Sequence, residues 1–102
     1  MNKVLLNTTF FFTPKVATAV QTTLRDYWLP ACGSCGESMP LCLKMPSEGG
    51  VDRLAIQTPF ASEELAQRFL SEVLEPIAGK MVGQLGADAF TCFSTLMEIV
   101  DL

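Results

Sequence analysis

The chain has 102 residues, a length typical of one domain spanning residues 1–102, and folding at this size buries only about 60 to 65% of the surface that the unfolded chain exposes. Hydrophobic residues make up 49% and charged residues 18% of the chain, which is more apolar than a small monomer needs, so we expect a homodimer. The net charge of −4 and the lack of any Lys or Arg run exclude nucleic acid and anionic membrane as partners.

The first predicted strand covers residues 4–12, where Val4, Leu6, Thr8, Phe10 and Phe12 share one side of a period-two pattern. Thr13 and Pro14 then suit the N-cap and the first position of a helix. Its apolar stripe is expected to hold the following residues: Val16, Val20, Leu24, Tyr27 and Trp28. Pro30 and Gly33 are expected to end this helix.

A hairpin and a second helix follow. Residues 39–45 and 53–58 alternate as strands around the turn Ser47-Glu48-Gly49-Gly50. Ser62 can cap a helix in which Glu64 and Arg68 make an i,i+4 pair. The buried stripe of this helix is expected to hold Leu65, Phe69, Leu70, Val73 and Ile77. Pro76 predicts a kink or a fresh helical start. The sequence does not predict which structure follows Pro76, and residues 90–100 are predicted to form the last strand.

The order strand, helix, strand, strand, helix, strand predicts a ferredoxin-like α+β sandwich with the antiparallel order 4-1-3-2 and both helices on one face. The other face stays open and suits either a dimeric α+β barrel or a ligand cavity. The residues expected on it are Leu5, Asn7, Thr9, Phe11, Cys42, Lys44, Ala55, Gln57, Cys92, Ser94, Leu96 and Glu98. Of these, the candidate ligand or dimer residues are Leu5, Asn7, Thr9, Phe11, Lys44, Gln57, Leu96 and Glu98.

The beginning of the chain imitates a signal peptide, because an apolar stretch follows Lys3 and Ala17-Thr18-Ala19 resembles a cleavage site. Polar residues 7–9 interrupt that stretch, however, and cleavage would remove the first strand. No run approaches the roughly 20 apolar residues of a membrane span. We therefore expect a cytoplasmic protein with thiols in place of a disulfide framework.

The motif Cys32-Gly33-Ser34-Cys35 invites a redox interpretation, but redox pairs need a thiolate activated at a helix N-terminus, and this pair follows a helix C-terminus. A zinc site would also need Cys42 and Cys92, which the strand order places on opposite sheet edges about 14 Å apart. An adventitious local disulfide between Cys32 and Cys35 is favoured over redox or metal chemistry, and we expect no metal or cofactor.

The chain has no His, which removes the usual general base and metal ligand. The carboxylate best placed for a ligand is Glu98, on the expected open face near Asn7, Gln57 and Lys44. A salt bridge between Glu98 and Lys44 across an interface is the simpler role.

Three segments resemble a family of short bacterial proteins, the family numbered 4286 among domains of unknown function. They are Trp28-Leu29-Pro30, the Gly36 that follows it, and the run Phe93-Ser94-Thr95-Leu96-Met97-Glu98. In that family a His stands where this chain has Trp28, so no role of the imidazole carries over. The resemblance covers almost the whole chain and implies a ferredoxin-like, dimeric domain without an established activity.

The sequence thus favours a non-enzymatic dimeric binding or interaction module that uses the open sheet face and takes a small molecule or a protein partner. The alternative is a cofactor-independent enzyme of the dimeric-barrel type, a small oxygenase or isomerase, with Glu98, Asn7, Gln57 and Lys44 around one pocket.

Overall fold

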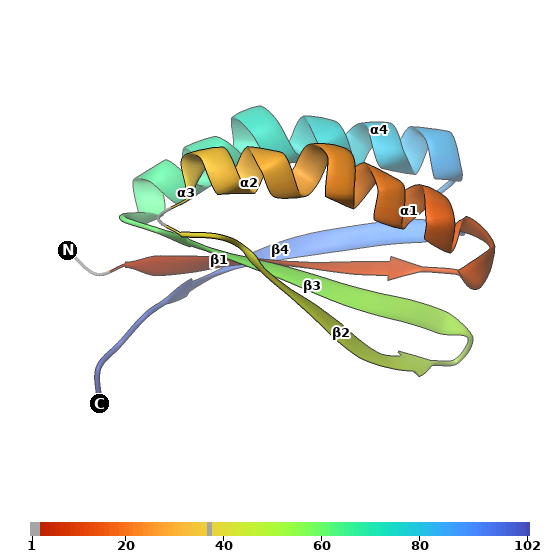
Figure 1. Ribbon diagram of the computed structural model, residues 1–102, viewed down its shortest axis with the longest axis horizontal. Helices are drawn as coiled ribbons and strands as arrows, with labels where there is room; N and C mark the ends of the chain where they lie inside the picture. The colour runs from red at the N-terminus through yellow and green to blue at the C-terminus, as the bar shows by residue number, and fades with distance from the viewer. Residues whose placement is uncertain (1–2, 37) are drawn as a thin grey trace.

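The computed structural model describes residues 3–36 and 38–102, which fold into one antiparallel sheet with helices on a single face (Figure 1). The strands are β1 (Val4–Phe12), β2 (Leu41–Glu48), β3 (Val51–Phe60) and β4 (Phe90–Glu98). Their order is β2-β3-β1-β4, so the first and third strands are central and β2 and β4 are edges. This is the predicted ferredoxin-like α+β arrangement.

The first helical segment is longer than predicted. It consists of η1 (Pro14–Val16), α1 (Ala17–Thr23), η2 (Leu24–Trp28) and α2 (Leu29–Cys35). Neither Pro30 nor Gly33 ends it, because η2 is a π-helical turn in which the Leu29 N–H donates to the Leu24 carbonyl. The wider turn accommodates the ring of Pro30, which in a regular helix would clash with the carbonyl four residues earlier.

The second helical segment uses the same device. It consists of α3 (Glu63–Phe69), η3 (Leu70–Leu74) and α4 (Glu75–Leu85). The Glu75 N–H donates to the Leu70 carbonyl, and Pro76 again follows the π-helical turn. Ser62 caps the helix as predicted, accepting a hydrogen bond from the Leu65 N–H at 3.3 Å. No helix within residues 3–36 and 38–102 is long and apolar enough to cross a membrane.

The core lies between the sheet and the helices. Phe10 of β1 meets Trp28 edge-on, with ring centroids 4.8 Å apart, and Phe60 packs beside Phe69 at 5.4 Å. The predicted burial of Tyr27 and Leu65 is wrong, because both side chains are exposed. The buried positions of the first helix recur every four residues through the π-helical turn, namely Val20, Leu24, Trp28 and Cys32.

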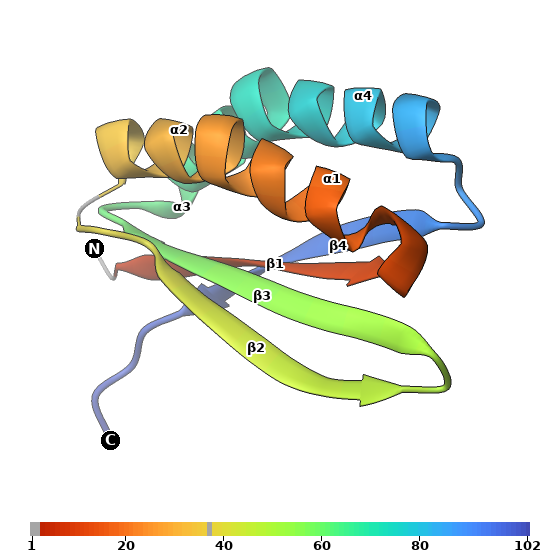
Figure 2. The ribbon, with the colours of Figure 1, turned by 45° about the vertical axis from the view of Figure 1, so that its right-hand side comes forward.

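The β2–β3 hairpin turns at Gly49 and Gly50, which have φ angles of 61° and 78°, as a two-residue hairpin turn requires. The hairpin tip extends away from the helices (Figure 2). Residues 41–44, at the other end of the edge strand β2, are exposed on both faces of the sheet.

Candidate functional site

Strand register shows which side chains lie on the face without helices. On β1 the helix-side residues are buried and alternate with Leu5, Asn7, Thr9 and Phe11, of which only Thr9 is also buried; Asn7 lies opposite Gln57 of β3. These four residues of β1, together with Ala55 and Gln57, lie on the open face as predicted, because directly paired residues project to the same side of a sheet.

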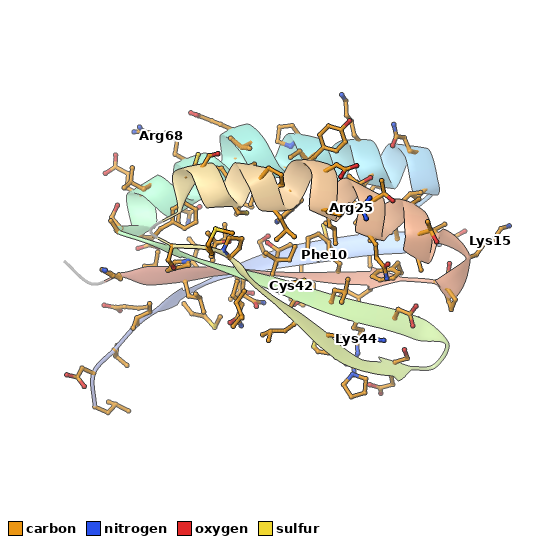
Figure 3. The ribbon with its side chains drawn as sticks, in the orientation of Figure 1. Phe10, Lys15, Arg25, Cys42, Lys44 and Arg68 are labelled. Atoms are coloured by element: carbon orange, nitrogen blue, oxygen red, sulfur yellow. The ribbon has the colours of Figure 1, made fainter. Side chains whose placement is uncertain are left out.

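The predicted faces of β2 and β4 are wrong. Lys44 pairs with Leu54, which itself pairs with the buried Phe10. Glu98 pairs with Val4 on the helix side. By the same alternation, the helix side also carries Cys42, Cys92, Ser94 and Leu96. Cys42 and Lys44 are labelled on β2 in Figure 3. The open face instead carries Leu41, Leu43, Met45, Thr91, Phe93, Thr95 and Met97.

The centre of the open face is polar and already hydrogen bonded. Gln57 Nε2 donates to Asn7 Oδ1 at 3.1 Å, and Asn7 Nδ2 donates to Thr9 Oγ1 at 3.2 Å. Beside this network Phe11 and Phe93 stack, with centroids 5.6 Å apart and planes 21° from parallel. The face therefore combines an amide pair with an apolar surround.

Exposed apolar side chains concentrate on this face and on the segments that continue its edge strands. They are Met39, Leu41, Leu43, Phe93, Met97, Ile99, Val100 and Leu102. Among the described residues, the other large exposed apolar side chains are Tyr27 and Leu65, both on the helices. The side chains of the first group lie along the two edges of the face, on either side of the hydrogen-bonded amides at its centre.

All four cysteines lie in the described part of the chain and are free thiols, so the disulfide expected between Cys32 and Cys35 is absent. The pair occupies the C-terminal end of α2, with Cys32 buried and Cys35 exposed. Burial raises the pKa of Cys32, the neighbouring Cys35 adds to the increase, and a hydrogen bond with Thr58 opposes it. An unactivated thiol does not suit disulfide exchange.

The other two cysteines occupy the opposite edge strands β2 and β4, as predicted. Burial also raises the pKa of Cys92. No group of three or more His, Cys, Asp or Glu side chains in the described ranges could hold a metal ion.

A second candidate site, which the sequence did not reveal, is a cleft of about 230 Å³ between β4 and the helices. It is lined by Trp28, Leu70, Leu74, Glu75, Ala78, Cys92, Phe93 and Ser94. Trp28 and Leu74 are almost fully buried and form its floor. On the strand side, the hydroxyls of Ser94 and Thr8 are hydrogen bonded at 2.8 Å. The cleft depends on the two π-helical turns, for which the sequence carries no periodic signal.

Comparison with known proteins identifies the fold. No family model and no curated protein matches the chain, so the resemblance to family 4286 stays a prediction. A dimeric ferredoxin-like protein from an uncultured marine organism is 18% identical, with a TM-score of 0.66 over 100% of this chain and 99% of its own. A putative antibiotic biosynthesis monooxygenase from Bacillus cereus is 13% identical, with a TM-score of 0.64 over 100% and 97%.

A third solved structure, a nipsnap family protein with unknown function from Agrobacterium tumefaciens, is 11% identical, with a TM-score of 0.62 over 97% of this chain and 89% of its own. Its chain, like the other two, is similar to this one in fold alone.

Proposed function

We propose that the protein is a homodimeric, non-enzymatic binding module whose two copies pair through their open sheet faces. The observation that carries this proposal is the concentration of exposed apolar side chains on the open face and its edge segments. Removing apolar surface from water stabilises a complex by about 25 cal/mol per Å². A structural neighbour described as a dimeric ferredoxin-like protein supports the same arrangement.

The open face is large enough for a stable interface. Four strands spaced about 4.8 Å apart, each about 30 Å long, give roughly 550 Å² of flat area. Side chains that project from the face raise its accessible area further, so it approaches the roughly 800 Å² per partner of a standard interface. A second copy of the chain offers the matching apolar surface.

The amide network at the centre of this face supplies specificity. Asn7 and Gln57 satisfy part of each other's hydrogen-bonding capacity within one subunit. Buried amides whose remaining groups lack partners destabilise an interface. We therefore expect the two subunits to align so that these amides meet polar groups of the partner, which fixes one register.

The enzymatic alternative requires four polar residues around one pocket, and the structure separates them. Asn7 and Gln57 lie on the open face, whereas Lys44 and Glu98 lie on the helix side of opposite edge strands. These four described residues therefore do not line one pocket, and we do not propose the oxygenase or isomerase reaction.

A pair of charge substitutions tests the dimer. Leu43 on the open face and Leu65 on α3 are 39% and 49% exposed, so both accept Glu without burying a charge in the monomer. We expect light scattering to give twice the chain mass of 11.1 kDa for the wild type and for Leu65→Glu, but the single mass for Leu43→Glu.

Circular dichroism checks that Leu43→Glu is folded, and Met97→Glu, also on the open face, replaces it if it is not. A wild type that is monomeric at 100 μM, or open-face variants that remain dimeric, would refute the proposal.

A further inference from the structure

We propose that the cleft between β4 and the helices binds a small, neutral hydroxy-aromatic molecule of one or two rings. Its volume is about 230 Å³. An apolar cavity of about 150 Å³ accepts benzene, so one ring fits with room to spare and two fused rings approach the limit. Larger ligands of drug size need about 300 Å³ or more.

The floor and one wall of the cleft are apolar and come from both π-helical turns. Trp28 is the last residue of η2, and Leu70 and Leu74 are the first and last residues of η3. Such turns are rare and occur frequently at functional sites, because the extra residue changes where the side chains project. Here both turns supply lining residues to one cleft, and a floor made of a buried indole edge and leucine side chains favours an apolar ligand.

The strand side of the cleft offers the hydroxyl of Ser94, which is hydrogen bonded to the buried hydroxyl of Thr8 behind it. Ser94 Oγ and Thr8 Oγ1 are 2.8 Å apart, and each hydroxyl is one donor and two acceptors. When Thr8 donates in this pair, Ser94 keeps its proton for a ligand; when Ser94 donates, its oxygen still accepts one more bond. A ligand hydroxyl, which can itself donate and accept, matches either orientation.

The charges around the cleft select a neutral ligand. Glu75 lies at the exposed rim, and no Lys or Arg is among the described residues that line the cleft. The net charge of the chain is also negative. A ligand carboxylate would lose its hydration without gaining a cation, which disfavours acids relative to phenols of the same shape.

This site does not rest on the proposed dimer, because its floor lies on the helix side of the sheet. Phe93 touches both regions, since it lines the cleft and stacks on Phe11 of the open face. Folded Leu43→Glu protein should therefore bind the same ligand as the wild type, which separates failure of the dimer from failure of the cleft.

The test uses 2-naphthol as the probe and 2-naphthoate as its charged counterpart, measured by calorimetry. The single Trp of the chain gives one indole N–H resonance by NMR, and we expect 2-naphthol to shift it. We expect 2-naphthoate to bind at least tenfold more weakly. Absence of 2-naphthol binding, or equal binding of both compounds, would overturn the proposal.

Two substitutions of alanine by phenylalanine locate the site. Ala78→Phe fills the cleft and should weaken 2-naphthol binding at least tenfold, whereas Ala19→Phe on the exposed face of α1 should leave it unchanged. Ser94→Ala should weaken binding of 2-naphthol about two- to tenfold, the range of one hydrogen bond, and leave naphthalene binding unchanged. Unaltered 2-naphthol binding in folded Ala78→Phe would place the ligand elsewhere and refute the assignment.

Alkylation of the wild type keeps the test valid if Ala78→Phe does not fold. N-ethylmaleimide should react more slowly with Cys92 when 2-naphthol is present, while the exposed Cys42 on the far edge strand serves as the internal control. Equal rates at Cys92 with and without 2-naphthol would contradict the proposal.

Discussion

Substitution of Gly36 by Ala should destabilise the domain, because the added Cβ atom would overlap its neighbours. Gly36 caps α2 with φ −79° and ψ 165°, an extended conformation that any residue adopts, so its backbone does not require glycine. A Cβ atom at this position would lie 2.5 Å from Thr58 Cγ2 and 3.0 Å from the Cys32 carbonyl oxygen. Carbon atoms normally approach to about 3.5 to 4.0 Å, so helix and strand must separate by about 1 Å.

The expected loss follows from that overlap. Thr58 is buried and β-branched, so its methyl group cannot rotate away freely. Overpacking of this kind costs about 1 to 3 kcal/mol. A loss of about 2 kcal/mol lowers the Tm of a 100-residue domain by roughly 8 to 16 °C. Thermal unfolding followed by circular dichroism measures this shift.

Two further variants make the result specific. Gly33 lies in the same helix with no atom within 4 Å of a built Cβ, so Gly33→Ala should stabilise the domain by about 0.5 to 1 kcal/mol. Thr58→Ser removes the clashing methyl group and keeps the hydroxyl, so Gly36→Ala should cost less in that background. A Tm of Gly36→Ala within 1 °C of the wild type would show that the close approach of α2 to β3 is not as described.

Two other properties can be measured on the same material. Burial raises the pKa of Cys32 and Cys92, so the folded state holds these protons more tightly than the unfolded chain does. The contribution of the two thiols to the free energy of unfolding is therefore fully present below pH ~8.5 and is lost as pH rises through the folded pKa values. The fall in Tm between pH 8 and pH 10.5 should be smaller in a Cys32→Ala, Cys92→Ala double variant, and an equal fall would contradict the burial of these thiols. Ser62→Ala removes the cap of the Leu65 N–H and should lower the free energy of unfolding by about 1 kcal/mol in urea titration; an unchanged midpoint would argue against that hydrogen bond.

The order of elements could be predicted because each apolar period is long and bounded by turn residues. Which face each residue of β4 occupies could not be predicted. Its two alternating sets, beginning at Phe90 and at Thr91, both contain apolar residues, so neither identifies the core side. A shift of one residue moves every side chain to the other face, which is why Leu96 and Glu98 were expected on the open side.

The error on β2 has a different physical origin. Cys42 and Lys44 were expected on the open face, which by alternation would turn Leu41 and Leu43 toward the helices, but the helices do not cover this edge strand. Burial within one subunit therefore does not determine which residues of β2 face the helices. In the first helix, Pro30 was expected to be a terminator because a one-residue π-helical expansion leaves no mark in hydrophobic periodicity.

The central position of β1 also determines when the domain can fold during synthesis. β1 hydrogen bonds with β3 on one side and β4 on the other, and the contact between Thr8 and Ser94 joins residues 86 apart in the chain. Until the ribosome has released β4, one edge of the most apolar strand has no partner. Sheet closure is therefore a late, long-range event of the slow kind, and the nascent chain exposes Phe10 and its neighbours to chaperones or to aggregation until that moment.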